Sequence, residues 1–151
     1  MPIEGGCLCR QVRFRSLQPP ILARACWCRV CQYLASGNAT INVVFAADGL
    51  TITGQTQDYL SRADSGSHMH RRFCPVCGTQ VFSAAEERPN LIVVRAGTLD
   101  DPSIAAPQGT IWTASAPPWA RIDLERPHYT GQPPAVSALH LSPSTGTAPT
   151  D

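Results

Sequence analysis

Seven cysteines in three tight groups are the residues of this 151-residue chain whose type and spacing point most directly to chemistry. The groups are a Cys-x-Cys pair, a Cys-x-Cys-x-x-Cys triplet and a Cys-x-x-Cys-Gly pair, formed by Cys7 and Cys9, by Cys26, Cys28 and Cys31, and by Cys74 and Cys77. Zinc takes four protein ligands at a structural site and keeps one position open where it does chemistry. Two pairs and one triplet therefore predict one closed metal centre and a second centre that is chemically available.

Other cysteine chemistries fit this pattern less well. An odd number of cysteines leaves one thiol out of any complete disulfide set, and the N-terminus carries no apolar signal segment. Ferredoxin-type clusters place their cysteines in one dense run followed by a proline, which differs from this spacing. Packing as small hydrophobic residues explains one or two cysteines but not three spaced groups. Metal binding is favoured, and reduced thiols predict a cytoplasmic protein.

Each group can bring its own sulfurs together over a short stretch of chain. If Cys7 and Cys9 lie in a strand, their side chains project from the same face. Cys74 and Cys77 have the spacing of a zinc knuckle, with Gly78 freeing the backbone just beyond them. Water, a substrate sulfur or a histidine could complete the central triplet. Spacing alone leaves open other ways of dividing the seven cysteines between metal ions, including one mixed cluster.

Histidines and arginines near the cysteines are candidates for supporting roles. An isolated histidine is more often an ordinary hydrogen-bonded residue than a metal ligand. The histidines that could compete for the open position are His68, His70 and His128. Because three or four thiolates around one Zn²⁺ carry net negative charge, nearby cations would stabilise them. The arginines beside the groups are Arg10, Arg29, Arg71 and Arg72.

Composition predicts one domain that is mostly β. The length suits a single ordinary domain. Eleven glycines and 14 prolines interrupt the chain too often for long helices, and short apolar or β-branched runs lie between them. One short helix is expected over residues 29–36, ending near Gly37. The expected strands are residues 10–16, 40–46, 50–53, 58–62, 69–73, 80–83 and 91–96.

Charge and hydropathy argue against two classes of partner. Lys and Arg number 12 against 11 Asp and Glu, a formal net charge of +1, which does not favour nucleic acid or anionic lipid. No apolar run reaches the roughly 20 residues of a membrane span. The chain is expected to divide into a zinc-binding domain over residues 1–131 and a Pro/Ser/Thr-rich tail over residues 132–151, in which only residues 136–141 could form regular structure.

With these motifs in view, the chain resembles the glutathione-dependent formaldehyde-activating enzyme family, also called the centromere protein V-like family. The stretches that carry the resemblance are GGCLCRQV at residues 5–12, CWCRVC at 26–31 with Ser36-Gly37 after it, FCPVCGT at 73–79, RAGTLDDP at 95–102, and Ile111-Trp112 with Trp119 following. They span about residues 4–128. Three ordered cysteine groups at these separations are specific, whereas the Asp-Asp-Pro piece alone is weak.

The resemblance implies a zinc-stapled, β-rich Mss4-like fold with short helical turns. It also implies two zinc ions per chain: a structural zinc held by Cys7, Cys9, Cys74 and Cys77, and a second, more labile zinc at the catalytic centre held by Cys26, Cys28 and Cys31. Family members often have a histidine between the first two cysteines of the central group. Here that residue is Trp27, which cannot carry a proton but could wall a more apolar pocket.

For function, the resemblance implies a carbon–sulfur lyase-type enzyme that promotes reversible addition of glutathione to formaldehyde, giving S-hydroxymethylglutathione. The sequence thus predicts a zinc-dependent site for a small thiol and a small aldehyde, with the triplet cysteines as ligands and not nucleophiles. Arg29 could pair with a glutathione carboxylate. The tryptophans that could line the pocket are Trp27, Trp112 and Trp119. The alternative is a non-catalytic zinc-binding interaction module or a thiol sensor, since an incompletely coordinated thiolate cluster is open to oxidants.

Overall fold

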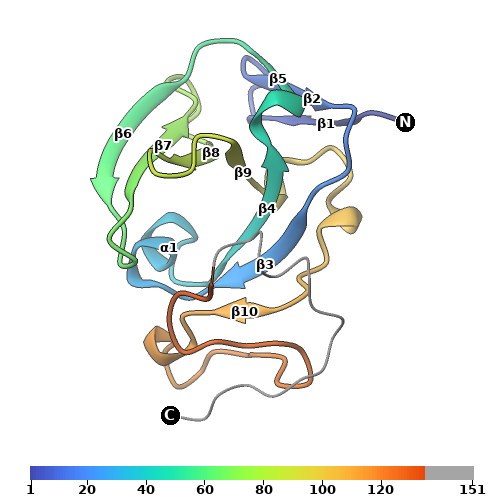
Figure 1. Ribbon diagram of the computed structural model, residues 1–151. Helices are drawn as coiled ribbons and strands as arrows, with labels where there is room; N and C mark the ends of the chain where they lie inside the picture. Colours follow the sequence, from blue (N-terminus) through green and yellow to red (C-terminus); the bar gives the residue numbers. More distant parts are fainter. Residues whose placement is uncertain (135–151) are drawn as a thin grey trace.

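Two β-sheets make up most of the fold in the computed structural model, which describes residues 1–134 (Figure 1). The smaller sheet has the strand order β1-β2-β5, and the larger has the order β10-β3-β4-β9-β8-β7-β6. The strands of the smaller sheet are β1 (Ile3–Gly6), β2 (Arg13–Ser16) and β5 (Leu50–Thr53). Those of the larger are β3 (Leu22–Cys26), β4 (Thr40–Ala46), β6 (Gln57–Arg62), β7 (His68–Phe73), β8 (Gln80–Ala85), β9 (Leu91–Arg95) and β10 (Thr110–Ile111). The mostly β class is confirmed.

The helical parts of the described chain are short. The single α-helix, α1 (Arg29–Leu34), begins after Cys28, whose sulfur accepts a hydrogen bond from the backbone N–H of Cys31. Gly37 follows with φ +99°, a left-handed conformation that glycine adopts freely. The 3₁₀ turns are Ala47–Gly49, Ala96–Thr98, Pro102–Ala105 and Thr113–Ser115. The helix expected over residues 29–36 is confirmed, ending two residues earlier. Among residues 1–134, none of the helices has the length and apolar character needed to cross a membrane.

Most of the predicted strands are confirmed, one is shorter than predicted and three observed strands were not predicted. Strands β4 and β5 have the predicted bounds, and β6 to β9 agree within two residues. The strand predicted over residues 10–16 is shorter, because residues 7–10 turn. Strands β1, β3 and β10 were not predicted. Strand β1 ends in Gly5 and Gly6, which in sequence indicate a turn. A Cβ at position 5 would lie 2.2 Å from the carbonyl oxygen of Thr98, so glycine is required for this close approach.

The hydrophobic core lies between the two sheets. Phe14 of β2 meets Phe82 of β8 edge to face, with ring centroids 5.6 Å apart. Alternate residues of β4, Val43 and Phe45, are fully buried on the same side, as the two-residue period of a strand requires. Val94 of β9, opposite Val43, completes this face of the larger sheet. Because these side chains point into the core, the residues that alternate with them point to the opposite face of the larger sheet.

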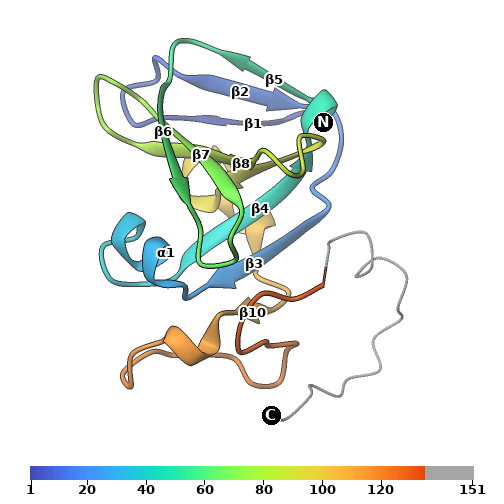
Figure 2. The ribbon, with the colours of Figure 1, turned by 60° about the vertical axis from the view of Figure 1, so that its left-hand side comes forward.

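The other face of the larger sheet carries polar side chains and faces α1. Thr40 and Asn42 alternate with Val43 along β4, and their cross-strand partners are Cys26 of β3 and Arg95 of β9. Side chains of directly opposed residues share one face of a sheet. Figure 1 shows β6, β7, β8, β9 and β4 curving around α1, and in the turned view of Figure 2 the helix still lies beside β4 and the end of β3.

The chain after β10 packs back against that strand. The backbone N–H of Tyr129 donates to the carbonyl of Thr110, and the N–H of Thr113 donates to the carbonyl of Tyr129, both at 3.0 Å. Trp112 Nε1 donates to Gln132 Oε1 at 3.2 Å, so ordered contacts continue just past the boundary expected at residue 131. The rest of the predicted tail, including residues 136–141, lies outside the described residues.

Candidate metal centres

The turn after β1 and the turn between β7 and β8 bring four cysteine sulfurs together. These sulfurs, here called the four-sulfur cluster, all lie within 4.8 Å of one another and belong to Cys7, Cys9, Cys74 and Cys77. The Sγ of Cys9 lies 3.6 Å from that of Cys7 and 3.7 Å from that of Cys74. Sulfurs at the corners of a zinc tetrahedron, each about 2.3 Å from the ion, would be about 3.8 Å apart. All four cysteines are free thiols, and their spacing fits zinc.

The prediction that Cys7 and Cys9 lie in a strand is wrong. Strand β1 ends at Gly6, and the next residues form a turn in which the N–H of Arg10 donates to the carbonyl of Cys7 at 2.9 Å. Arg10 adopts φ +66°, which closes the reversal. The turn brings the sulfurs of Cys7 and Cys9 to within 3.6 Å of each other.

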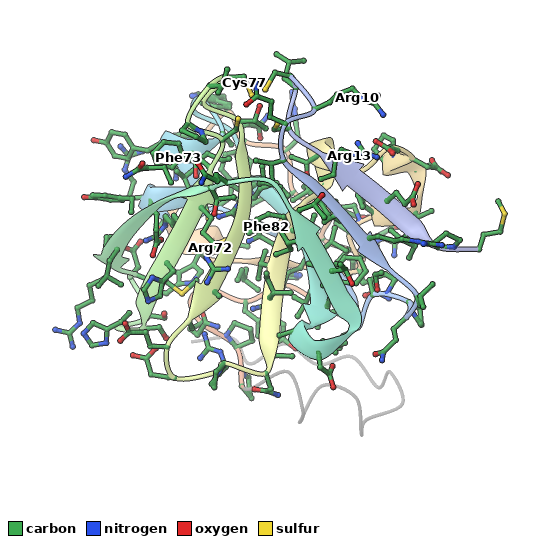
Figure 3. The ribbon with its side chains drawn as sticks, turned by 90° about the horizontal axis from the view of Figure 1, so that it is seen from above. Arg10, Arg13, Arg72, Phe73, Cys77 and Phe82 are labelled. Atoms are coloured by element: carbon green, nitrogen blue, oxygen red, sulfur yellow. The ribbon has the colours of Figure 1, made fainter. Side chains whose placement is uncertain are left out.

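Hydrogen bonds favour the ionised form of two sulfurs of the four-sulfur cluster, those of Cys77 and Cys7, whereas burial and the neighbouring thiols raise the pKa of Cys9 to about 12. The hydroxyl of Thr79, 3.1 Å from Cys77 Sγ, is the main cause that lowers the pKa of Cys77 to about 5. Burial opposes ionisation of Cys7, but the N–H of Val12, 3.2 Å from its sulfur, and the neighbouring thiols lower its pKa. Figure 3 shows Cys77 and Arg10 at the same end of the molecule. Thiolates are the form that binds zinc.

The junction between β3 and α1 gathers the other three sulfurs. This three-sulfur cluster consists of Cys26, Cys28 and Cys31, whose sulfurs lie within 4.8 Å of one another. Cys26 is the last residue of β3, Cys28 caps α1 and Cys31 lies in its first turn. All three are buried, at 4% to 7% exposure. Ile111 of β10 packs against them, as do Trp112 and Tyr129 of the segment that follows this strand.

Burial and mutual hydrogen bonds prevent the three thiols from ionising independently. Hydrogen bonds from Cys26 and Cys28 are the largest causes that lower the pKa of Cys31 to about 2, and Thr40 and Arg95 add to this effect. The same hydrogen bonds, together with burial, raise the pKa of Cys26 strongly. A divalent cation would allow all three to ionise together. Each cluster could therefore hold a metal ion.

The three predicted histidine candidates are engaged elsewhere. His68 Nδ1 lies 2.8 Å from Glu87 Oε1, and His128 Nδ1 lies 3.0 Å from the carbonyl of Arg126. His70 lies between Asp58 and Glu86. Within residues 1–134, neither cluster gains a histidine, aspartate or glutamate ligand. The three-sulfur cluster therefore keeps its fourth position free of side-chain donors of these types.

The tryptophans proposed for the pocket occupy different places. Trp112 packs against the three-sulfur cluster and has φ +60°, a left-handed conformation that is strained for a bulky residue. Trp27 is buried at 3% exposure and meets Trp119 edge to face, with centroids 6.1 Å apart. Trp119 itself is 63% exposed. Of the three, only Trp112 is among the residues packed on the sulfurs.

Arg29 is held on the surface of α1. Its guanidinium carbon lies 5.3 Å from the ring centroid of Tyr33, and its Nη1 donates to Gln32 Oε1 at 2.5 Å. Its backbone N–H donates to Asp64 Oδ2 at 3.2 Å, which ties the β6–β7 hairpin to the start of α1. The structure thus gives Arg29 partners within the chain.

Sequence reasoning missed Arg95, the cation that faces the three-sulfur cluster from β9. Its guanidinium donates to Asn42 Oδ1 and to Ser83 Oγ. Its charge also helps to lower the pKa of Cys31. The available signal was an arginine that directly follows the apolar run Leu-Ile-Val-Val, where a charge needs a specific partner.

Comparisons with known proteins agree with this architecture. Residues 2–115 match the family described as glutathione-dependent formaldehyde-activating enzyme. A Halomonas elongata protein with the provisional name of glutathione-dependent formaldehyde-activating enzyme is 30% identical over 129 residues, covering 82% of each chain. The crystal structure of a Rhodobacter sphaeroides protein superposes with a TM-score of 0.50 at 21% identity, covering 64% of this chain and 87% of that one.

The family match extends over more than half of the chain and includes all seven cysteines. The two sheets and the two sulfur clusters are those of the Mss4-like fold that the resemblance implied, so that prediction is confirmed. The chain belongs to the glutathione-dependent formaldehyde-activating enzyme family.

Proposed function

We propose that the protein is a zinc-dependent carbon–sulfur lyase-type enzyme that promotes reversible addition of a thiol such as glutathione to formaldehyde or a related small aldehyde. The observation that carries this proposal is the three-sulfur cluster, in which three sulfurs converge and no histidine or carboxylate of residues 1–134 joins them. Three protein ligands with one free position are typical of catalytic zinc. Family membership supports the reaction class.

The two clusters have different roles. In this proposal the chain holds two zinc ions, one in each cluster, and the ion in the three-sulfur cluster is the more labile. The four-sulfur cluster is structural, because it links turns that are far apart in the chain and so restricts the unfolded state. Cys26, Cys28 and Cys31 act as ligands and do not attack the substrate.

The reaction itself needs little beyond positioning and charge. A zinc ion bound at the three-sulfur cluster would supply Lewis acidity and lower the pKa of a thiol that meets its open position. The carbon–sulfur bond forms between thiol and aldehyde, and the thiol proton ends on the former carbonyl oxygen, so no further reactant is consumed. Ile111 and Trp112 pack on the cluster and exclude water from it. The guanidinium of Arg95, which lies near Cys31, would stabilise the negative charge that develops on the aldehyde oxygen as the carbon–sulfur bond forms.

Exchange measurements by NMR test this proposal. Formaldehyde and glutathione equilibrate with their adduct in solution, and the zinc-loaded protein should increase the exchange rate at unchanged equilibrium. Cys28→Ser removes one ligand of the three-sulfur cluster while leaving the four-sulfur cluster intact, so it is the matched control and should return the rate to that of the buffer. Equal rates with and without the wild-type protein would remove the named activity.

A non-catalytic zinc-binding module or thiol sensor is the second candidate. The observation that favours it is burial, since the three sulfurs are only 4% to 7% exposed. Two hollows among the described residues, of about 300 and 420 Å³, lie along β2 and beside Cys7 instead. We favour the enzyme, because the three cysteine donors determine what chemistry a metal at this cluster can perform. The hollow beside the four-sulfur cluster offers no open metal position. All seven cysteines are free, which fits a reducing compartment such as the cytoplasm.

A further inference from the structure

Three arginines on the face of the larger sheet that carries the three-sulfur cluster have no acidic partner among residues 1–134: Arg24 of β3, which is opposite Asn42, and the more distant Arg71 and Arg95. Arg71 of β7 is buried at 5% exposure and donates to Ser61 Oγ. Arg95 of β9 is half-buried, with its Nε fully shielded from solvent, and donates to Asn42 Oδ1 and Ser83 Oγ. Within residues 1–134, neither guanidinium has a carboxylate within ion-pair distance. All their hydrogen-bond partners are neutral.

The sheet register places Arg95 near the cluster and Arg71 beyond Arg95, farther from the sulfurs. Cys26 is opposite Thr40, and Arg95 is opposite Asn42, two residues farther along β4. Neighbouring strands are about 4.8 Å apart and two residues span about 6.6 Å, so the guanidinium of Arg95 can reach the surroundings of the sulfurs. Arg71 is opposite Ser83, which itself accepts from Arg95. One polar row thus runs from β3 across β4, β9 and β8 to β7.

The charges along this row do not balance. Three thiolates and one Zn²⁺ sum to a single negative charge, whereas Arg24, Arg71 and Arg95 supply three positive charges. One buried polar atom on this row, Arg95 Nε, also lacks a hydrogen-bond partner among the described residues. Buried charge and unpaired polar atoms are costly unless a ligand compensates them. The row is therefore short of at least one anionic group with free acceptor atoms.

We propose that Arg95 and Arg71 bind a carboxylate of the substrate, so that the preferred substrate is a short compound with a carboxylate within about three bonds of its reacting sulfur or carbonyl carbon. The planar fork of arginine suits a carboxylate. A short ligand also fits the burial of the cluster. The carboxylates of glutathione lie much farther from its sulfur. This inference rests on the proposed function and narrows its substrate class.

Calorimetric titration of the zinc-loaded protein can test for this carboxylate site. One arm compares mercaptoacetate with its neutral amide, and the other compares glyoxylate with its neutral amide, so that the thiol and the aldehyde are distinguished as the source of the carboxylate. In at least one arm the acid should bind roughly 10- to 100-fold more tightly than the amide, as charge-assisted hydrogen bonds imply. Equal binding of acid and amide in both arms would overturn the proposal.

Arginine variants test which residues cause the preference for the acid over the amide. Arg95→Gln and Arg71→Gln should each reduce the acid-to-amide ratio toward one. Arg72→Gln is the matched control, because Arg72 adjoins Arg71 but lies on the opposite face of β7, and it should leave the ratio unchanged. An acid-to-amide ratio that Arg71→Gln leaves unchanged in folded protein would contradict the assignment of the carboxylate site to these arginines. If Arg95→Gln fails to fold, the comparison of acid and amide in the wild-type protein still tests the site.

The two proposals can fail separately. If the acid is preferred but glutathione–formaldehyde exchange is not accelerated, the carboxylate site stands and the named activity falls. If exchange is accelerated but acid and amide bind equally, the activity stands and the carboxylate site falls.

Discussion

The sulfur of Cys9 lies 3.7 Å from the sulfur of Cys74, although 65 residues separate them in the sequence. Cys9 belongs to the turn that joins β1 to β2 in the smaller sheet, whereas Cys74 follows β7 in the larger sheet. A metal ion shared by these sulfurs would tie the two sheets together at one end of the core. The three-sulfur cluster, by contrast, spans only six consecutive residues of the chain.

This difference predicts unequal effects on stability. Cys74→Ser removes a buried ligand of the closed centre, so the free energy of unfolding should fall by about 3 kcal/mol or more. Cys28→Ser makes the same chemical change in the three-sulfur cluster and should cost less, because the metal there closes no long loop. Thermal unfolding followed by circular dichroism checks this. Equal losses in the two variants would argue against a structural role specific to the four-sulfur cluster.

A second prediction concerns the close approach of β1 to the loop after β9. A Cβ at Gly5 would lie 2.2 Å from the carbonyl oxygen of Thr98 and 2.3 Å from Phe14 Cζ. Gly5→Ala should therefore destabilise the fold by about 1–3 kcal/mol through overpacking. At Gly97 a Cβ would meet nothing within 4 Å, so Gly97→Ala is the control. Urea denaturation measures both variants, and a neutral Gly5→Ala would show that β1 is placed differently.

Gln32 is predicted to hold α1 to the segment after β10. It is buried at 5% exposure, and its Nε2 donates to the carbonyls of Trp27 at 2.7 Å and Ser115 at 2.9 Å. Gln32→Leu keeps the approximate volume but leaves both carbonyls unpaired, which should cost about 1–3 kcal/mol. The same substitution at the exposed Gln55 should be close to neutral. Chemical denaturation of both variants provides the comparison, and similar midpoints would contradict the role of Gln32.

A pH-dependent contribution is predicted for His70. Asp58, followed by Glu86, raises the pKa of His70 above its ordinary value of 6.5. Because the pKa is raised in the folded state, protonated His70 stabilises the fold fully below about pH 6.5, and this contribution is lost as pH rises through the folded pKa. Asp58→Asn should lower the pKa of His70, whereas substitution of the exposed Asp48 should not. NMR titration of the imidazole protons checks this, and an unchanged pKa in Asp58→Asn would refute the pairing.

Local patterns in the sequence predicted the parts of the fold that local patterns determine. Strand β4 alternates apolar residues between two turns, and its bounds were predicted correctly. Strand β3, Leu-Ala-Arg-Ala-Cys, carries little β propensity of its own and forms because it pairs with β4 on one side and β10 on the other. Strand β3 therefore depends on pairing with strands that are distant in the sequence, and a short stretch of sequence cannot reveal this pairing.

The same distinction applies to the sulfur clusters. Short spacing favoured the three-sulfur cluster, because its ligands lie within six residues at one strand–helix junction, although spacing alone left one mixed cluster open. Spacing left the partition of the other four cysteines open, because their grouping depends on how the two sheets pack. Arg95 was missed because its partner Asn42 lies 53 residues earlier, and only the register of β4 against β9 places the two side chains together.

Zinc counting by native mass spectrometry tests the central claim most directly, that one chain holds a closed centre and a separate open one. Protein purified anaerobically with zinc should carry two ions per chain. The Cys28→Ser variant should carry one and keep the circular dichroism spectrum of the wild type. Two ions retained in Cys28→Ser, or loss of the folded spectrum together with its metal, would contradict the account.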